Sequence, residues 1–287
     1  MVKLSGDSDQ TSGLASNSKS HDSMKQLLDI MAQLRNPEGG CPWDLKQDFH
    51  SILPHTLEEA YEVADAIESN NRLQLRDELG DLLFQVVFYC QLAREEGSFE
   101  FADVAQTMSD KLIRRHPHVF DPKGNDLKQG AVAIDADQVL ERWESIKQTE
   151  RDAKQQHSVL DDVPNALPAM QRSAKLQKRA ANVGFDWPDL NSVLASMAEE
   201  LEEVQEAVAS GDKDHTIKEL GDLMFACVNM ARHSKQDPEQ VMRAANAKFE
   251  RRFRFLEAQL LAVGEDLENV SLERMDAGWD AAKAAGL

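Results

Sequence analysis

An acidic pattern occurs twice in the sequence with the same internal spacing, and this repetition constrains the fold more than any other feature. Its members are Glu59, Glu62, Glu78 and Asp81 in the first copy, and Glu200, Glu203, Glu219 and Asp222 in the second. Each copy reads E-x-x-E followed by E-x-x-D, with the third acidic residue sixteen positions after the second, and the copies are 141 residues apart. Such self-similarity indicates two related domains in a chain of 287 residues.

Apolar residues around the acidic pairs recur with the period of an α-helix. One such stripe consists of Leu75, Leu79, Leu82, Leu83 and Val86. Glycine and proline are few, at 14 and 9 residues, and no segment alternates polar and apolar residues as a strand would. We therefore predict an all-α fold, a tandem repeat of two helical-bundle domains.

Changes in composition place the domain boundaries. Residues 1–22 are rich in serine, aspartate, glycine and asparagine without apolar periodicity, which predicts a disordered tail. Two prolines predict a linker over residues 158–168. An N-terminal helical domain is thus expected over residues 23–157 and a C-terminal one over residues 169–287.

The pattern also predicts individual helices. The first acidic helix is expected to begin near Thr56, a good N-cap residue with Glu59 three positions later. Predicted helices in the rest of the chain cover about residues 24–34, 101–115, 170–181, 190–210, 213–233 and 237–262. A polar loop is expected at 121–135, followed by a helix that contains Trp143 and ends near residue 154. A final helix contains Trp279.

Charge and cysteine content limit the partners and the compartment. The net charge of −19 would repel a nucleic acid or an anionic membrane, and no apolar run is long enough to span a bilayer. The N-terminus lacks the apolar core of a signal peptide, and three scattered cysteines form neither a disulfide framework nor a zinc pattern. We expect a cytoplasmic protein that binds neither nucleic acid nor membranes.

The spacing of the carboxylates predicts a metal site. Residues three apart lie on the same side of a helix, so two adjacent antiparallel helices can gather all four carboxylates of one copy. Such a cluster is destabilising without a cation, and hard oxygen ligands suit Mg²⁺, with Mn²⁺ as a substitute. A di-iron bundle would need Glu-x-x-His, which the chain lacks. The alternative is that both acidic faces merely meet water, a feature that duplication can also copy.

A glycine precedes the aspartate in both copies. Gly80 and Gly221 cost helix stability of about 1 kcal/mol each relative to alanine. Their recurrence predicts close approach of another helix or a ligand.

Basic residues follow each acidic set. They are Lys111, Arg114 and Arg115 in the first copy, and Lys248, Arg251 and Arg252 in the second. Lys248 and Arg252, four residues apart, can face one phosphate ligand while Arg251 faces elsewhere. Asn246 adds a polar group where the first copy has Ser109, which favours the second copy as the working site. The alternative is a solvated basic face.

Tryptophans occupy matching positions late in each copy. Trp143 and Trp279 are each followed four residues later by lysine. Either could stack on a nucleobase, or could pack in a core or an oligomer contact. Trp43 and Trp187 are interpreted as turn anchors.

These residues resemble the MazG family of nucleoside triphosphate pyrophosphohydrolases, within the all-α NTP pyrophosphatase superfamily. The resemblance rests on the duplicated acidic signature and its basic helices, and on the stretches at residues 40–44, 114–120 and 182–187. It covers the chain from about residue 24 to the end. It implies Mg²⁺-dependent hydrolysis of NTPs and dNTPs to a monophosphate and pyrophosphate, a role in cleaning the nucleotide pool, and a homodimer.

The resemblance also implies roles for individual residues. Metal ligands would be Glu200, Glu203, Glu219 and Asp222, with a second site at Glu59, Glu62, Glu78 and Asp81. Phosphate contacts would fall on Lys248 and Arg252, with Trp279 near the nucleotide, and the C-terminal copy would be the main catalytic unit. Where family members often carry a lysine, this chain has Ser196, so the resemblance does not extend to a basic contact there.

Glu199, beside the cluster, or one of the ligands is a candidate general base for an attacking water. Two other classes of function compete with the enzyme. A nucleotide sensor would keep the metal site without turnover, and a helical scaffold would use its acidic faces only for solvation. Dependence on a metal would distinguish the scaffold from the enzyme and the sensor. Turnover of a nucleotide would distinguish the enzyme from the sensor.

Overall fold

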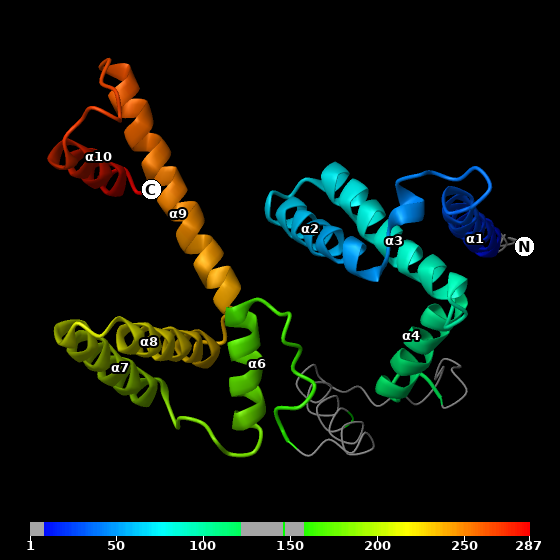
Figure 1. Cartoon of the computed structure of the whole chain (residues 1–287), viewed down its shortest axis with the longest axis horizontal. Helices are drawn as coiled ribbons and strands as arrows, with labels where there is room; N and C mark the ends of the chain where they lie inside the picture. The colour runs from blue at the N-terminus through cyan, green and yellow to red at the C-terminus, as the bar shows by residue number, and fades with distance from the viewer. Residues whose placement is uncertain (1–8, 122–145, 147–157) are drawn as a thin grey trace, which may run out of the picture. The chain divides into compact units, whose positions relative to one another are not determined.

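The computed structural model of the chain describes residues 9–121, 146 and 158–287. This described part contains α-helices and one short 3-10 helix but no β-strand (Figure 1). The prediction of an all-α fold is therefore confirmed. The chain divides into two compact units, unit 1 over residues 1–147 and unit 2 over residues 148–287.

Unit 1 is built around a hairpin of two antiparallel helices. Its elements are α1 (Asp9–Leu34), the 3-10 helix η1 (Asp44–Lys46), α2 (Phe49–Glu68), α3 (Arg72–Glu95) and α4 (Phe101–Arg115). The hairpin consists of α2 and α3, and α1 packs against α3 (Figure 1). The buried core comprises Met31, Ile52, Val87, Phe88 and Leu92.

A buried arginine fastens the segment before α2 to α3. Arg35 is 8% exposed and donates to both carboxylate oxygens of Glu95, at 2.6–3.1 Å. It also donates to the backbone carbonyls of Asp44 and Gln47, the latter at 3.2 Å. Its guanidinium lies 5.4 Å from the centre of the Phe88 ring. One side chain thus joins α1, η1 and α3.

The start of α1 differs from the predicted disordered tail. This helix begins at Asp9, so residues 9–22 are helical and not irregular. Serine and asparagine cost a helix interior only fractions of a kcal/mol each. A helix already nucleated by packed residues such as Leu27 and Met31 can therefore continue backward through a polar segment.

The start of α2 also differs from the prediction, because the cap is Asp48 and not Thr56. The Asp48 carboxylate accepts from the backbone N–H groups of His50 and Ser51, and Ser51 completes a capping box. Thr56 instead lies within the helix, where its hydroxyl is 2.8 Å from that of Tyr89. Pro54 also lies within the helix, which runs through it.

Unit 2 repeats the hairpin and adds two helices. Its elements are α6 (Ala169–Ala181), α7 (Leu190–Ser210), α8 (Lys213–His233), α9 (Pro238–Ala262) and α10 (Leu272–Ala284). The bounds of α6 to α9 agree with the predicted helices to within one residue, and α10 contains Trp279 as predicted. Asp189 and Asp212 cap α7 and α8 through their side chains, and Gly211 takes a left-handed φ of 74° in the turn between them.

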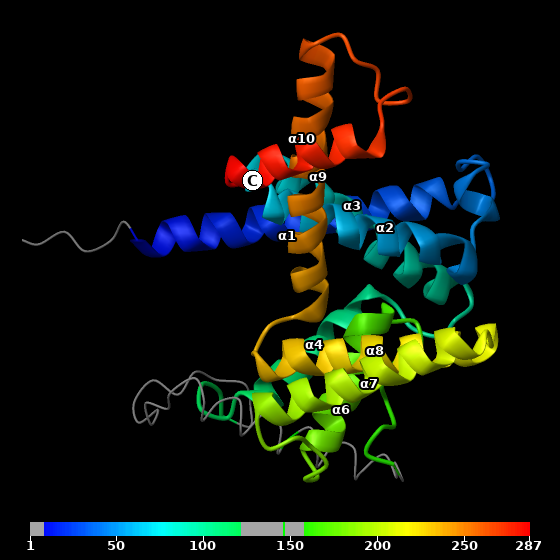
Figure 2. The same ribbon diagram turned by 90° about the vertical axis from the view of Figure 1, so that its left-hand side faces the viewer.

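The far helices of unit 2 form a separate pair. Figures 1 and 2 show α10 beside the C-terminal part of α9, away from α7 and α8. Gly278 makes this packing close, since a Cβ there would meet the Cδ1 atom of Leu256. The predicted helix through Trp143 lies outside the described residues. In the part of the chain that the structure describes, no helix combines the length and apolarity needed to cross a membrane.

Candidate functional site

The two hairpins each gather three carboxylates at one place. In unit 2, oxygens of Glu200 on α7 and of Glu219 and Asp222 on α8 lie within 4.8 Å of one another. The corresponding residues of unit 1 lie equally close, and they are Glu59, Glu78 and Asp81. Small buried residues such as Ala207 and Ala226 let α7 and α8 pack closely enough to do this.

The fourth acidic residue of each set borders the triad. Glu203 is exposed, and a hydrogen bond with Glu219, followed by burial, raises the pKa of its carboxyl. In unit 1, burial and then the charge of Glu78 raise the pKa of Glu62. The structure thus brings together all four predicted ligands of each copy, three of them tightly.

The carboxylates of both clusters repel one another. Burial, and next the charge of Asp222, raise the pKa of Glu200. Burial and the charge of Asp81 do the same for Glu59. Carboxylates that repel one another in this way favour either protonation or a bound cation. A set made only of carboxylate oxygens fits Mg²⁺ or Mn²⁺ and does not suit zinc or copper.

The two clusters differ in the residue one turn before the third glutamate. His215 lies 3.0 Å from Glu219 in unit 2, an ion pair when the imidazole is protonated. In unit 1 that position is Gln74, whose amide donates to Glu78 at 3.3 Å. Glu199, the candidate base, is exposed, and its charge adds to the field at Glu200.

The glycines beside the aspartates face open space. A Cβ built on Gly80 or Gly221 would meet no atom of the described residues within 4 Å. Close approach of another helix of the same unit, one of the two predicted reasons, is therefore wrong. The open space leaves room for a ligand or for a second copy of the chain.

The predicted phosphate-binding residues of unit 2 lie in a different place from the carboxylates. Arg252 on α9 donates from Nε to the backbone carbonyl of Leu287 at 2.7 Å, and its guanidinium lies 5.7 Å from the Trp279 ring centre. Trp279 also packs on Phe249, with ring centres 5.3 Å apart. The remaining members of this group are all exposed on α9: Asn246, Lys248 and Arg251.

The basic residues of unit 1 lie at the end of α4. Arg114 and Arg115 fall in its last turn, with Lys111 one turn earlier. The hydroxyl of Ser109 donates to the carbonyl of Ala105 at 2.9 Å, so it is used within its own helix. Trp143, the predicted partner of these residues, lies outside the described residues.

A cavity of about 550 Å³ adjoins the carboxylates of unit 2, and the sequence did not reveal it. Glu200 and Asp222 form part of its wall, and α6, α7, α8 and the turn at residues 184–187 supply the rest. Trp187, interpreted from sequence as a turn anchor, lines this cavity and is 44% exposed. The only signal for it in the sequence was the aromatic stretch before α7.

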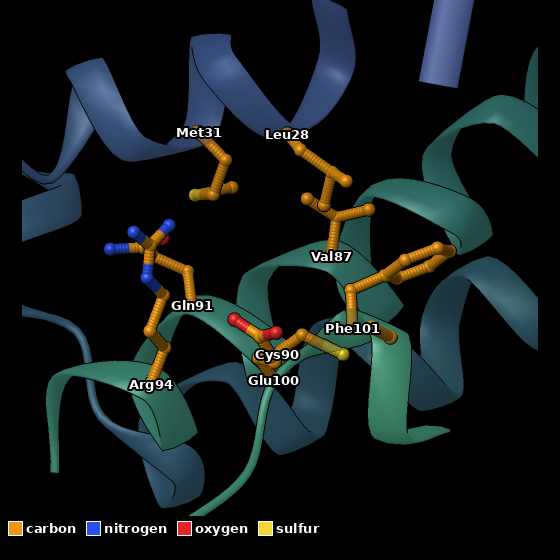
Figure 3. Close-up of a pocket in the computed structure, with 9 residues that line it drawn as sticks. Leu28, Met31, Val87, Cys90, Gln91, Arg94, Glu100 and Phe101 are labelled. Carbon is orange, nitrogen blue, oxygen red and sulfur yellow. The ribbon is translucent and has the colours of Figure 1, made fainter. Parts of the chain in front are cut away.

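A smaller cavity of unit 1 is differently placed. It measures about 170 Å³ and lies between α1, α3 and the start of α4. Figure 3 shows Leu28 and Met31 of α1 facing Val87 of α3, with Phe101 beside them. None of the four cluster carboxylates of unit 1 lines it; the carboxylate in its wall is that of Glu100. Of the cavities described, the one beside a carboxylate triad lies in unit 2.

Fold and site define the class of this protein: an all-α chain with a duplicated helical hairpin and a carboxylate cluster in each copy. The MazG nucleotide pyrophosphohydrolase domain matches residues 47–120 and 189–254, which contain the two clusters. A nucleoside triphosphate pyrophosphohydrolase of Escherichia coli (strain K12) is 50% identical over 260 residues, 90% of this chain and 96% of that protein.

A second relative extends the match. The nucleoside triphosphate pyrophosphohydrolase/pyrophosphatase MazG of Thermotoga maritima is 40% identical over 260 residues, 90% of this chain and 95% of its own. YabN of Bacillus subtilis is 42% identical over 255 residues, which cover 88% of this chain and 50% of that protein. The chain belongs to the MazG family.

Proposed function

We propose that this protein hydrolyses nucleoside triphosphates to a nucleoside monophosphate and pyrophosphate, acts on both NTPs and dNTPs, and depends on Mg²⁺. The observation that carries this is the convergence of Glu200, Glu219 and Asp222 beside a cavity of ligand size. Family membership supports the reaction, since the relatives from Escherichia coli and Thermotoga maritima bear that activity in their names. The products fit a role in cleaning the nucleotide pool.

The carboxylates of unit 2 would hold the metal, with Glu203 at the edge of the set. Bound Mg²⁺ would supply positive charge that offsets the negative charge developing at phosphorus. Glu199, exposed beside the cluster, takes a proton from the attacking water. The water oxygen bonds to the α-phosphorus, the bond from that phosphorus to the bridging oxygen breaks, and pyrophosphate leaves.

We infer that the protein works as a homodimer in the cytoplasm. Lys248 and Arg252 are the proposed phosphate contacts, yet in one chain Arg252 is engaged with Trp279 and the C-terminus. A second copy that packs on the open side of α8 at Gly221 offers a route for basic residues to reach the acidic cluster. Free cysteines at positions 41, 90 and 227 are consistent with a reducing compartment.

Unit 1 is proposed as a second metal site with a regulatory or structural role. It has the carboxylates Glu59, Glu78 and Asp81, but neither of the two cavities described in it is lined by them. The second candidate function for the whole protein is a nucleotide sensor without turnover. Unit 1 is the only half of the chain that favours it.

Product analysis of the purified protein with a panel of NTPs and dNTPs in Mg²⁺ tests the proposal. We expect monophosphate and pyrophosphate, at least 100-fold less of both with Glu200→Ala, and near-normal amounts with the matched variant Glu59→Ala. Full turnover by Glu199→Gln would exclude Glu199 as the base. Diphosphate and phosphate as products would contradict the reaction. Mg²⁺-dependent nucleotide binding without turnover would make the protein a sensor.

A further inference from the structure

The helices around the unit 2 cavity carry charges of opposite sign. α7 has five glutamates and neither lysine nor arginine. α6 has four basic residues and no acidic one, and no acidic residue occurs anywhere from position 163 to position 185. Side chains of both helices line the cavity, and α6 packs on α8, which carries two of the clustered carboxylates. The cavity therefore lies between an acidic helix and a basic one.

The basic residues of α6 lie beside the face of this helix that lines the cavity. Leu176, Gln177 and Ala180 form that face. The residues that we call the α6 basic stripe are Arg172, Lys175, Lys178 and Arg179. They follow one another in steps of mostly three and four residues, which places them along one side of the helix. Because a helix is about 10–12 Å across, their charges act on the cavity from about 10 Å.

Much of the positive charge of the α6 basic stripe is not cancelled by acidic neighbours. Arg172 donates to a neutral group, Oδ1 of Asn165, at 2.9 Å. Lys175 and Arg179 form no side-chain hydrogen bond or ion pair in the part of the chain that the structure describes. The stripe is therefore a source of positive potential beside the cavity.

Stability does not account for the charge on Arg179. This side chain is partly buried, and its Nη1 atom is buried without a hydrogen-bond partner among the described residues. A charge that is taken partly out of water without an opposite charge is unfavourable for the fold, and an apolar side chain of similar volume is often at least as stable. The potential that the guanidinium creates at the cavity offers a reason for an arginine at this position.

An anionic ligand has to approach this cavity against the charge of the whole chain. The net charge is −19, and the glutamates of α7 stand next to the cavity. A cleft with positive charge beside it can raise the rate of association with an anion by about 10- to 1,000-fold. Lys248 and Arg252 of α9 lie in a different place from the carboxylates, whereas α6 adjoins the cavity.

We propose that the α6 basic stripe attracts the anionic substrate to the unit 2 cavity, while the carboxylates of α7 and α8 hold its metal. The inference rests on the proposed function and adds the capture of the substrate to it. The stripe acts before the chemical step, so it raises the rate of capture and does not change the hydrolysis of substrate that is already bound.

Steady-state kinetics at two ionic strengths test this with the full-length protein, ATP and Mg²⁺. Lys175→Gln/Lys178→Gln removes two exposed charges. A Mg²⁺-bound triphosphate carries about two negative charges, so Coulomb's law over about 10 Å gives about a sevenfold loss of kcat/KM at about 0.01 M ionic strength. At about 0.15 M the Debye length is only about 8 Å, and the loss should shrink to about twofold. It should appear in KM, with kcat unchanged.

Arg254→Gln/Arg274→Gln is the matched control. It changes the net charge by the same amount, but at α9 and α10, where the two arginines pair with Glu250 and Glu265. This variant should change kcat/KM by less than about twofold at either ionic strength, because screening limits the reach of surface charges. A control that matches the lysine variant would show an effect of net charge alone and would overturn the inference.

Arg179→Met supplies a second variant with a different readout. It should lower kcat/KM about threefold at about 0.01 M ionic strength, the effect of one charge at about 10 Å. Its melting temperature without nucleotide should not fall, because the guanidinium has no acidic partner to lose. A merely structural role would instead lower the melting temperature together with kcat/KM, and that result would contradict the role given to Arg179.

Two results with the lysine variant would overturn the inference whatever Arg179→Met does. Equal salt dependence of kcat/KM in wild type and in Lys175→Gln/Lys178→Gln would mean that these lysines only meet water. A loss of kcat with KM unchanged would assign them to the chemical step and not to capture.

Failure of the proposed function is distinguishable. Wild-type protein that hydrolyses no nucleotide would contradict the reaction, and calorimetric binding of ATP with Mg²⁺ would still decide the role of the stripe. At about 0.01 M ionic strength the affinity of Lys175→Gln/Lys178→Gln should then be about sevenfold weaker than that of wild type. Equal affinities would overturn the inference, and no binding of ATP by wild type would overturn both.

Discussion

At the scale of residues, Asp186 holds the turn that forms one wall of the cavity. It accepts from Arg232 and lies 3.0 Å from Nε2 of His233, both on α8. The hydrogen bonds from Arg232, with a further contribution from His233, lower the pKa of Asp186 from 3.8 to about 2. The carboxylate is thus more stable in the folded protein than in the unfolded chain.

This shift predicts a pH-dependent effect of Asp186→Asn. A lowered pKa contributes stability that is fully present above 3.8 and is lost as the pH falls toward about 2. At pH 7 the variant should lose about 1–2 kcal/mol of the free energy of unfolding, a value reduced for partial exposure. Urea unfolding at several pH values measures this, and the difference from wild type should shrink below pH 3.8. A difference that is constant from pH 7 to pH 2.5 would contradict the assignment.

Residues of the site were predictable where chemistry follows a helical period. Glu200, Glu219 and Asp222 were found because residues three apart share a helix face and the pattern recurs 141 residues away. Gln177 and Asn229 were not found, because they belong to different helices and no local spacing relates them. The packing of α6 on α8 brings both of them to the wall of the same cavity.

At the scale of elements, the sequence predicted helix bounds best where a capping residue directly precedes an apolar period. Asp212 before α8 is such a case. The bounds failed at α2, where the cap is Asp48 and not Thr56, and at α1, where a polar segment continues a packed helix. At α2 a second local capping box was overlooked, whereas at α1 the neighbouring packing sets the length of the helix.

The contact between α1, η1 and α3 predicts a large effect of Arg35→Met. The guanidinium is 8% exposed, so its removal leaves Glu95 and two backbone carbonyls without their donor. Since Glu95 is partly exposed, we expect a loss of about 2–3 kcal/mol in the free energy of unfolding of unit 1.

Lys25→Met is the matched control for this contact. Lys25 pairs with Asp29 on the surface of α1, at 2.8 Å, where both side chains are mostly exposed. Urea denaturation followed by circular dichroism should show a clear shift for Arg35→Met and none for the control. Equal midpoints for Arg35→Met and wild type would mean that the buried pair contributes nothing net.

At the scale of the whole molecule, each hairpin leaves apolar side chains beside its open glycine. Leu79 precedes Gly80 and Leu220 precedes Gly221, and both leucines are about half exposed, at 49% and 47%. Met224, one turn after Leu220, is 56% exposed. A surface of this kind, repeated in both units, favours a symmetric contact between two copies of the chain.

The homodimer predicts a specific loss of assembly with Leu220→Lys. A lysine in an apolar contact without a partner charge would cost several kcal/mol on association, enough to raise the dissociation constant at least 100-fold. Light scattering after size exclusion should give twice 32.1 kDa for the wild type and 32.1 kDa for the variant. Leu272→Lys, an exposed leucine at the start of α10, is the control and should remain dimeric.

Activity measured on the same samples connects assembly to the reaction. Because Arg252 is engaged with Trp279 and the C-terminus of its own chain, we expect monomeric Leu220→Lys to bind Mg²⁺ but to lose turnover at least tenfold. Wild-type protein that is monomeric at micromolar concentration and fully active would refute the dimer. The phosphate contacts would then have to come from residues of one chain, and the open side of α8 would be left for the triphosphate itself.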